Sequence, residues 1–493
     1  MSVEPVRRLS ELVRRPVKVD PLIAGVTADS RKVGPGYLFA AIPGSTTDGR
    51  RFIPMALEKG AGAVLADDDG GEPGVFVGAP LVRAVDVRRA YALAAGRFWG
   101  AQPEVVVAVT GTNGKTSVAT FCRQIFSRLG RRAASLGTLG LELEGEALTG
   151  PGLTTPDAEA VARMAAELVG RGVTHLALEA SSHGLDQRRI DSLNLKAAGF
   201  TNLTQDHLDY HGDMDSYRRA KMRLFDTLCP TGGTAVLNAD SPEFPAFAAT
   251  AYQRGQSILS VGAAGRSLTL ADRRPEPDGQ TLVLRWRGRG YSVRLPLAGA
   301  FQAANALVAA GLCIAAGEDA DAVIDALGFL KGAPGRLQRI GRSADGGEAY
   351  VDYAHTPDGL ATVLAAVRPH AKGRVAVVFG AGGDRDATKR PLMGQAAAAG
   401  ADLIIVTDDN PRSEDPAKIR AQVLEGCPTA LEVGDRRAAI RAAVEQLRAG
   451  DVLVVAGKGH EQGQTIAGVT HPFNDAAETA AALISRGGVV GDD

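Results

Sequence analysis

Short apolar runs and helical patterns alternate along most of this 493-residue chain. Val105–Val109 is apolar and β-branched, as expected for a buried parallel strand, and Val118–Leu129 then carries apolar residues at helical spacing. The same run type recurs at several later places that we expect to be strands: His175–Glu179, Ala197–Thr201, Arg374–Phe379, Leu403–Thr407 and Asp451–Ala456. Strands that alternate with helices predict an α/β protein built on parallel sheets.

The segment between the first of these strands and its helix has the pattern of a phosphate loop. Thr110–Ser117 reads Thr-Gly-Thr-Asn-Gly-Lys-Thr-Ser, and glycines there allow backbone N–H groups to close around a polyphosphate. Lys115 is placed for the β- and γ-phosphates and the Thr116 hydroxyl for Mg²⁺. Val109 stands where the strict motif has its first glycine, so this is a variant loop. The alternative interpretation is a glycine-rich turn that carries a surface lysine.

The length of the chain predicts about two to four domains rather than one core. We expect a three-domain α/β fold: a small N-terminal α/β domain over 1–102, a central phosphate-loop domain with an ATPase-like parallel sheet over 103–333, and a C-terminal Rossmann-like α/β domain over 334–493. The Ala-Pro-Gly-Arg turn at Ala333–Arg336 reads as the second linker.

Composition excludes several classes of protein. The net charge is −1 with both signs spread along the chain, which favours neither nucleic acid nor a membrane surface. The four cysteines are far apart and form no CxxC pair, as is typical of a reducing cytosol. The N-terminus lacks the apolar segment of a signal peptide, and no apolar run reaches the ~18 residues that span a bilayer. We therefore expect a cytoplasmic protein without a membrane span.

Two polar segments follow predicted strands of the central region. Glu179 ends a strand where ligands bind in open α/β sheets, and its carboxylate is a candidate Mg²⁺ ligand. The next strand opens into Asn202–His211, a loop with two histidines and two aspartates that includes His207. This loop is either directed at a metal or a capped loop of hydrogen-bonded polar residues, and the pattern leaves both interpretations open.

Lys221 lies on an apolar face of a predicted helix over Ser216–Phe225, four residues after Tyr217 and three before Leu224. Removal from water lowers the pKa of a lysine, and a neutral amine can add CO₂ to form a carbamate, which is an anion that binds metals. The alternative is a lysine that extends to solvent from the edge of the face.

The C-terminal region carries three polar loops after predicted strands, at Gly380–Arg385, Asp408–Arg412 and Gly457–Glu461. A parallel sheet places such loops along one edge, where they suggest a site for a small, zwitterionic ligand. Arg385 stands where a dinucleotide fingerprint has its third glycine, so NAD binding is not predicted.

Together these motifs resemble the Mur ligases, the cytoplasmic ATP-dependent enzymes that form amide bonds in peptidoglycan synthesis. The matching segments run nearly from end to end: Asp29-Ser30-Arg31, Thr110–Thr116, Thr154–Asp157, Glu179–Gly184, the loop at His207, Ala220-Lys221, Asn305, Gly335-Arg336, Asp352–Pro357 and Gly457–Glu461. Each motif alone is weak, and their number and order carry the resemblance. Gln302 departs from the asparagine of many members but keeps the amide.

Within the family, the chain is most similar to members that add a diamino acid to UDP-N-acetylmuramoyl-L-alanyl-D-glutamate. Asp409-Asn410-Pro411-Arg412 matches the form that takes meso-diaminopimelate rather than lysine. Other possibilities are a lysine-adding Mur ligase, an amide ligase similar to folylpolyglutamate synthase, or a regulatory phosphate-loop ATPase that binds cell-wall precursors without joining them.

The resemblance also implies roles for individual residues. ATP would be bound by Gly111, Thr112, Asn113, Gly114, Lys115, Thr116 and Ser117, with Asn305, Arg336 and Asp352 completing the nucleotide site. Mg²⁺ would lie near Thr116, Glu179, His207 and a carbamylated Lys221, and the last three together with Lys115 would be catalytic. The UDP-sugar dipeptide would contact Ser30, Thr154, Thr155, Ser181, Gln187 and Arg189. Diaminopimelate would contact Arg385, Asp409, Asn410, Pro411, Arg412, Gly457 and Glu461. We expect a monomer.

Overall fold

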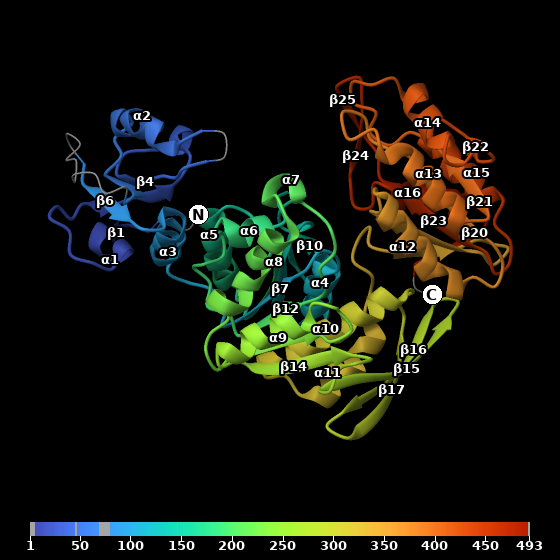
Figure 1. Cartoon of the computed structure of the whole chain (residues 1–493), viewed down its shortest axis with the longest axis horizontal. Coiled ribbons are helices and arrows are strands. Elements are labelled where there is room, and N and C mark those ends of the chain that lie inside the picture. The colour runs from blue at the N-terminus through green and yellow to red at the C-terminus, as the bar shows by residue number, and fades with distance from the viewer. Residues whose placement is uncertain (1–4, 45–46, 69–78, 145, 151, 492–493) are drawn as a thin grey trace. The chain divides into compact units, whose positions relative to one another are not determined.

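The computed structural model describes residues 5–491 except 45–46, 69–78, 145 and 151 (Figure 1). The chain divides into two compact units: Met1–Ser260 with Gly311–Asp319, and Val261–Ala310 with Ala320–Asp493. Each unit consists of strands that alternate with helices, as the hydrophobic pattern predicts. The domain boundaries at 102 and 333 stay predictions.

The first unit begins with a small parallel sheet of order β3-β4-β5-β6. Its strands are β3 (Gly25–Thr27), β4 (Tyr37–Ala41), β5 (Ala63–Asp67) and β6 (Leu81–Ala84), and β1 (Arg7–Arg8) pairs with β2 (Leu22–Ile23) beside them. The helices are α1 (Leu9–Val13), α2 (Ile53–Glu58) and α3 (Val87–Trp99). Leu38, Leu65 and Tyr91 lie in the core that these elements share.

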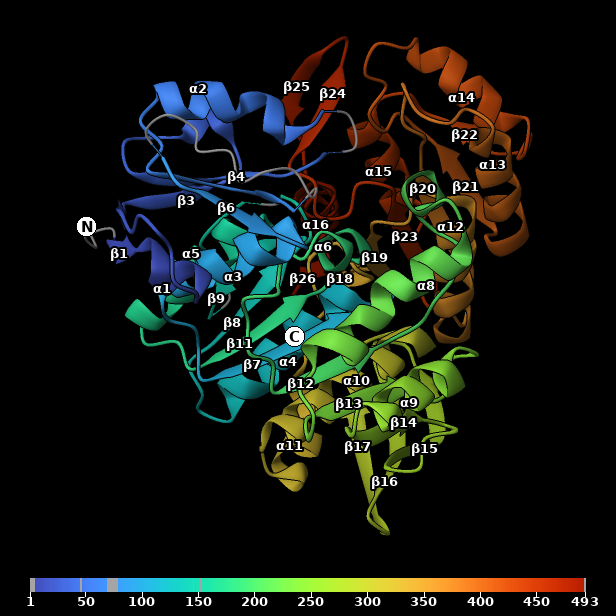
Figure 2. The same ribbon diagram turned by 60° about the vertical axis from the view of Figure 1, so that its left-hand side comes forward.

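A larger sheet follows in the same unit, in the order β10-β9-β8-β11-β7-β12-β13-β14. Its strands are β7 (Val105–Thr110), β8 (Ala133–Gly137), β9 (Gly140–Leu143), β10 (Glu146–Ala147), β11 (His175–Glu179), β12 (Ala197–Phe200), β13 (Thr234–Asn238) and β14 (Ser257–Gly262). β8, β11, β7, β12 and β13 are parallel neighbours, visible together in Figure 2. The loops after Thr110, Glu179 and Phe200 therefore leave the sheet at one edge.

The helices of this region begin where the sequence supplies suitable caps. α4 (Lys115–Arg128) starts after Gly114, whose φ of 88° is left-handed, and α5 (Ala158–Gly170) is capped by the Asp157 carboxylate. The remaining helices are α6 (Ser182–Asp186), α7 (Leu208–His211), α8 (Met214–Arg223) and α9 (Phe244–Gln253). A π-helical turn over Leu224–Leu228 continues α8, which the sequence pattern did not predict.

The second unit contains an antiparallel meander and a mainly parallel sheet. The meander is β15 (Leu268–Glu276), β16 (Gly279–Trp286) and β17 (Arg289–Leu295). α10 (Ala300–Ala316) begins in this unit and α11 (Ala320–Ala326) follows.

The mainly parallel sheet of the second unit has the order β22-β21-β20-β23-β19-β18-β26. Its strands are β18 (Gln338–Arg342), β19 (Glu348–Asp352), β20 (Val375–Phe379), β21 (Leu403–Val406), β22 (Leu431–Glu432), β23 (Val452–Ala456) and β26 (Val489–Val490), and β24 (Gly463–Ile466) pairs with β25 (Val469–Pro472) as a separate hairpin. The helices are α12 (Pro357–Val367), α13 (Lys389–Gly400), α14 (Pro416–Leu424), α15 (Arg436–Glu445) and α16 (Asp475–Ser485). β19, β23, β20 and β21 are parallel, so the three polar loops of this region lie along one sheet edge.

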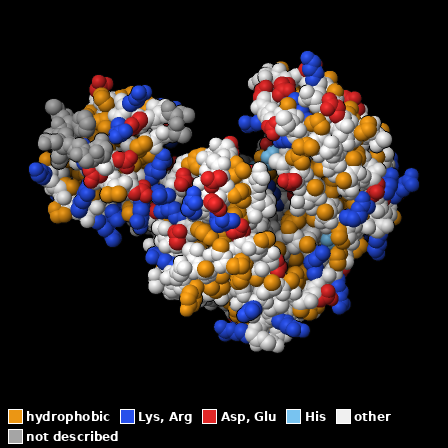
Figure 3. Space-filling model, in the orientation of Figure 1, with side chains coloured by type: hydrophobic (Ala, Val, Ile, Leu, Met, Phe, Trp, Pro, Cys, Tyr) orange, Lys and Arg blue, Asp and Glu red, His pale blue; other side chains and the backbone are white. Residues whose placement is uncertain are grey.

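All four cysteines are reduced and buried. Burial raises the pKa of the Cys229 thiol to about 11, and it also raises the pKa values of Cys313 and Cys427. On the face shown in Figure 3, positive and negative side chains are interspersed over each unit. No helix among the described residues is both long enough and apolar enough to cross a membrane.

Candidate active site

The phosphate loop is held in place by the segment that follows β12. The Asn202 carbonyl accepts the Thr112 N–H at 2.9 Å and its side-chain oxygen accepts the Asn113 N–H at 3.0 Å. Position 111 has room only for glycine, because a Cβ atom there would collide with the Thr201 hydroxyl. Lys115 bends back over the loop, where its Nζ donates to the Gly111 and Thr112 carbonyls at 2.9 and 2.8 Å. The first N–H groups of α4 have no intrahelical acceptor and suit an anion.

Glu179 lies beside this loop with 2% of its surface exposed. Its Oε2 accepts the Thr116 hydroxyl at 3.1 Å, and its Oε1 accepts the Thr138 N–H at 2.8 Å. A Cβ atom at Gly137 would collide with the carboxylate, so the end of β8 has room only for glycine. The structure thus brings together Thr116 and Glu179, two oxygen donors of the kind that Mg²⁺ prefers.

His207 lies in the loop between β12 and α7. It has a left-handed φ of 52°, its side chain is about half exposed, and its ring meets His183 edge-on with centroids 4.9 Å apart. Among the described residues no three His, Cys, Asp or Glu side chains form a group that could hold a metal ion. In this structure His207 therefore belongs to an aromatic cluster with His183, Tyr210 and His211.

Lys221 is buried with 1% exposure, so the alternative of a solvent-seeking side chain is wrong. Tyr217, Ala220, Leu224 and Phe225 are buried on the same helical face, as their spacing predicted. The Lys221 Nζ donates to the Gly111 carbonyl at 2.7 Å and lies 4.3 Å from the centre of the Tyr217 ring. Burial, and next the charge of Lys115, hold the Lys221 pKa well below its ordinary value.

Five of the residues expected at the UDP-sugar dipeptide form one hydrogen-bonded network, which the structure places next to Glu179. The Thr155 hydroxyl lies 3.0 Å from that of Ser181, and the Arg189 guanidinium donates to the Thr155 carbonyl and to the Gln187 amide oxygen at 2.7 Å each. The Thr154 hydroxyl lies 3.0 Å from that of Thr138, a residue that sequence reasoning missed although it follows the end of β8. Ser30, in the small N-terminal sheet region, is buried.

In the second unit, Asn305, Arg336 and Asp352 also lie close together. Gln302 links two of them, because its amide oxygen accepts from Asn305 at 3.3 Å and its nitrogen donates to the Arg336 carbonyl at 2.8 Å. Asp352 accepts the Leu337 and Ala354 N–H groups, and burial raises its pKa. The departure at Gln302 therefore keeps an amide that connects its neighbours.

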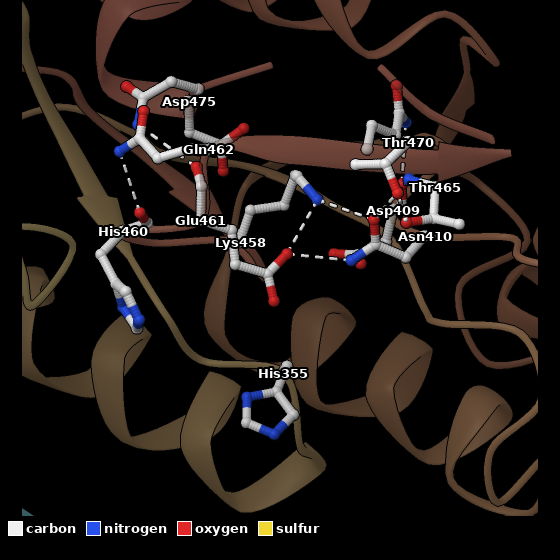
Figure 4. A network of polar contacts seen from close by, with 12 residues as sticks. His355, Asp409, Asn410, Lys458, His460, Glu461, Gln462, Thr465, Thr470 and Asp475 are labelled. Carbon is white, nitrogen blue, oxygen red and sulfur yellow. Dashed lines mark hydrogen bonds and ion pairs between the residues drawn. The ribbon is translucent and has the colours of Figure 1, made fainter. Parts of the chain in front are cut away.

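The three polar loops of the second unit follow β20, β21 and β23. Figure 4 shows two of these loops, with Asn410 beside Lys458 and Glu461. The Asn410 amide donates to Glu461 Oε2 at 2.9 Å, and an Arg412 guanidinium nitrogen donates to the Gly383 carbonyl at 2.6 Å. Asp409 is buried, and its Oδ2 accepts no hydrogen bond from the part of the chain that the structure describes. Gly457 lies directly against this oxygen, and a Cβ atom there would collide with it.

The remaining expected residues of this region are Arg385 and Pro411. Arg385 is exposed after β20, and Pro411 is buried. Sequence reasoning missed Lys458, which is completely buried between Asn410 and Glu461. A lysine within a polar loop gives no local signal of burial, so only the fold reveals this contact.

The phosphate loop, the buried carboxylate at the neighbouring strand end and the α/β sheets define a phosphate-loop nucleotide-binding protein. Three family descriptions match the chain: "Mur ligase family, catalytic domain" over residues 22–99, "Mur ligase middle domain" over 109–313, and "Mur ligase, glutamate ligase domain" over 335–459. The chain belongs to the Mur ligase family, and its three-domain α/β fold is confirmed.

Named relatives cover almost the whole chain. A UDP-N-acetylmuramoyl-L-alanyl-D-glutamate--2,6-diaminopimelate ligase of Caulobacter vibrioides is 65% identical over 97% of this chain and 99% of its own length. A ligase of the same name from Bradyrhizobium diazoefficiens is 50% identical over 97% of this chain and 99% of its own. A solved structure of a ligase of that name superposes with a TM-score of 0.75 at 35% identity, covering 98% of this chain and 99% of that one.

Proposed function

We propose that this chain is an ATP-dependent ligase that joins meso-diaminopimelate to UDP-N-acetylmuramoyl-L-alanyl-D-glutamate in peptidoglycan precursor synthesis. The observation that carries the proposal is the 65% identity, over 97% of the chain, to a relative with that name. The Asp409-Asn410-Pro411-Arg412 loop, on which the choice of amino acid depends, lies at a sheet edge. It includes the buried Asp409 carboxylate, whose Oδ2 accepts no hydrogen bond from the described residues.

The reaction needs an activated carboxylate, because a carboxylate itself is a poor acylating agent. The D-glutamate carboxylate attacks the γ-phosphorus of ATP, so that an acyl phosphate forms and ADP leaves. The amine of the diamino acid then adds to the acyl carbon, and the tetrahedral intermediate releases inorganic phosphate and a proton. Both steps depend on alignment and charge neutralisation more than on a protein nucleophile.

The phosphate loop supports the first step. Lys115 bends over the loop toward the Gly111 and Thr112 carbonyls, and an ATP phosphate would compete with these carbonyls for its charge. The first N–H groups of α4, from Lys115 to Ser117, add a favourable dipole. From the resemblance, we assign Gly111, Thr112, Asn113 and Gly114 to the nucleotide as well. We assign Asn305, Arg336 and Asp352 to the nucleotide as well, on the resemblance and on their shared hydrogen bonds.

The residues around Glu179 fit Mg²⁺. The Thr116 hydroxyl and the Glu179 carboxylate are hard oxygen donors, they already touch, and their surroundings are buried. Bound Mg²⁺ supplies charge neutralisation for the phosphoryl oxygens. We assign His207 to the same ion from the resemblance alone.

We propose that Lys221 carries a carbamate. The Lys221 ammonium first loses one proton. The neutral amine nitrogen then bonds to the carbon of CO₂ and loses a second proton, so that the buried cation becomes an anion beside the phosphate loop. Support comes from the 1% exposure of the side chain and from its contact with the Gly111 carbonyl at 2.7 Å. The carbamate would help to hold a second Mg²⁺.

The UDP-sugar dipeptide would contact the network beside Glu179. The network supplies hydroxyl, amide and guanidinium groups that are joined by hydrogen bonds, from Thr154, Thr155, Ser181, Gln187 and Arg189. Burial lowers the pKa of Arg189, yet the guanidinium keeps its charge at neutral pH and suits an anionic partner. Ser30 is assigned from the resemblance.

Diaminopimelate differs from lysine by a carboxylate on its distal carbon, so its site needs a cation for that group and an anion for the distal ammonium. Arg412 can offer a planar fork to the carboxylate, and Arg385 adds positive charge at the exposed side. Glu461 and Asp409 suit the ammonium, with Asn410, Pro411 and Gly457 shaping the loops around them.

We also propose a monomer in the cytoplasm, where ATP and UDP-linked precursors occur, and domains that span residues 1–102, 103–333 and 334–493. Alternating strand and helix on both sides of Ala333–Gly335 support the second boundary. Analytical ultracentrifugation at micromolar concentration would test the oligomeric state, and limited proteolysis would test the boundaries.

A ligation assay tests the function. The protein is incubated with ATP, the UDP-dipeptide and one of several acceptors, and both phosphate release and the UDP-tripeptide mass are measured. We expect phosphate release only when the UDP-dipeptide and meso-diaminopimelate are both present, with a Lys115→Ala variant as the inactive control. A specificity constant for lysine comparable to that for meso-diaminopimelate would place the chain among lysine-adding ligases. Phosphate release without product would indicate a regulatory ATPase.

A further inference from the structure

Lys458 is completely buried, although it lies in a polar loop after β23. Its Nζ donates to the Asn410 side-chain oxygen at 3.0 Å and to Glu461 Oε2 at 2.9 Å (Figure 4). A buried ammonium lowers the stability of a protein unless it is paired and hydrogen-bonded. The contacts with Asn410 and Glu461 supply this pairing for Lys458.

The two contacts of Lys458 determine how the Glu461 carboxylate is held. Glu461 Oε2 accepts both from Lys458 and from the Asn410 amide nitrogen at 2.9 Å, whereas Oε1 accepts no hydrogen bond from the described residues. The Glu461 side chain keeps 34% exposure. One oxygen is therefore fixed by the protein and the other is presented to a ligand.

The orientation of Asn410 depends on the same lysine. Its side-chain oxygen accepts from Lys458 and from the Thr465 N–H at 2.9 Å, so both donors require the oxygen on that side. The amide nitrogen must then point at Glu461, because a flipped amide would set donor against donor. Lys458 thus acts on Glu461 directly and through Asn410.

Lys458 also adjusts the charge of the site. Asp409 and Glu461 contribute two negative charges, and Lys458 neutralises one of them. The nearby Arg436 is already paired with Asp475, with two contacts of 2.7 Å and no exposure of either side chain. Among Asp409, Glu461 and Lys458 one negative charge remains, which can face a single ammonium group, while Arg412 and Arg385 supply the positive charge for the distal carboxylate.

We propose that Lys458 is a positioning residue that fixes Glu461 toward the distal ammonium of the diamino acid. It thereby sets the preference for an acceptor that carries this ammonium over one that lacks it. The inference rests on the proposed function, which assigns Glu461 to that ammonium. Lys458 touches neither the reacting amine nor the acyl phosphate in this scheme.

The test compares two acceptors, meso-diaminopimelate and 2-aminopimelate, which keeps both carboxylates but lacks the distal amine. In Lys458→Met we expect the ratio of the specificity constant for meso-diaminopimelate to that for 2-aminopimelate to fall by about tenfold or more. The reason is that a misplaced Glu461 carboxylate no longer binds the distal ammonium. KM values for ATP and the UDP-dipeptide should stay unchanged. Lys458→Arg, which keeps the charge and donors, should recover part of the ratio.

Arg420→Met is the matched control, since Arg420 pairs with Asp408 and Glu432 beside the same loop without touching Asn410 or Glu461. An equal loss for both acceptors in Lys458→Met would reduce the lysine to a structural role and overturn the inference. If Lys458→Met does not fold, Lys458→Gln carries the same comparison. A wild-type protein that ligates neither acceptor would instead refute the proposed function.

Discussion

Lys221 lies where its own positive charge is disfavoured. It is buried against Tyr217 and close enough to Lys115 for the two cations to repel each other, and the loop carbonyl of Gly111 is its hydrogen-bond acceptor. A neutral amine in such surroundings is nucleophilic toward CO₂. The carbamate would convert a repulsive pair of cations into an attractive pair of opposite charge.

We expect Lys221→Ala to lose at least about 100-fold in ligation, because the anion near the phosphate loop is lost. Lys221→Glu should recover part of the activity by returning a carboxylate. Labelling with ¹³C bicarbonate should give a carbamate carbon signal in the wild type that is absent from Lys221→Ala. The control is Lys196→Ala, which removes an exposed lysine. Full activity of Lys221→Ala in CO₂-free buffer would exclude a carbamate role.

Arg412 has a left-handed φ of 54° and is half-buried, which does not agree with a freely solvated turn residue. Its N–H donates to the Thr465 carbonyl at 3.0 Å and its guanidinium to Gly383. These bonds hold the fork in place and leave further N–H donors for a carboxylate.

We expect Arg412→Ala to lower the specificity constant for meso-diaminopimelate by about 10- to 100-fold, the cost of a charge-assisted hydrogen bond. Binding of ATP and of the UDP-dipeptide, measured by calorimetry, should change little. Arg412→Lys keeps the positive charge but not the planar guanidinium, so its specificity constant for meso-diaminopimelate should lie between those of the wild type and Arg412→Ala. A variant that prefers diaminopimelate over lysine as strongly as the wild type would show that Arg412 does not read the distal carboxylate.

At the scale of elements, the loop after β23 places His460 beside Tyr353, with ring centres 5.1 Å apart. Burial, and next the charge of Arg336, lower the His460 pKa to about 4. Its Nδ1 is buried and has no hydrogen-bond partner among the described residues. In the unfolded chain the His460 imidazole takes up a proton near the ordinary pKa of 6.5, whereas in the folded protein the same imidazole stays neutral until about pH 4. Folding stability should therefore fall as the pH drops through this window.

His460→Phe keeps a ring against Tyr353 and removes the proton-binding group. We expect its urea midpoint to fall less than that of the wild type between about pH 7.5 and about pH 4.5. The histidine contributes at most about 3 kcal/mol to the change in the free energy of unfolding over this range. His471→Phe, at an exposed position on β25, should behave as the wild type does. Parallel pH profiles for the wild type and His460→Phe would refute this assignment.

Features that depend on neighbouring residues or on adjacent parallel strands were predictable, and features that depend on the conformation of loops or on contacts between loops were not. The strand, the glycine loop and the start of α4 follow from neighbouring residues, and the apolar spacing around Lys221 correctly placed it on a buried face. The meeting of Thr116 with Glu179 needed only parallel neighbours. The position of His207 depends on a left-handed loop residue, and the burial of Lys458 depends on loops from two separate strands.

At the scale of the whole molecule, the reaction needs water to be excluded while the acyl phosphate exists. We expect the N-terminal and C-terminal domains to close on the middle domain when ligands bind, with hinges near Gln102 and Ala333–Gly335. Small-angle scattering should show a smaller radius of gyration with an ATP analogue and the UDP-dipeptide than without them. Lys115→Ala with the same ligands is the control, and an unchanged wild-type profile at saturation would count against closure.

The burial of every cysteine has a practical consequence for watching that motion. The thiolate is the nucleophile that reacts with a thiol-reactive dye, and all four thiols are shielded by burial. Burial also raises the pKa of Cys229, Cys313 and Cys427, which lowers their thiolate fraction. We therefore expect the native cysteines to react very slowly with maleimide dyes. Tyr252→Cys on α9 and Leu392→Cys on α13 introduce exposed attachment points, one on each unit. A fluorophore pair at these two positions would report single-molecule distances during turnover without replacing any native cysteine.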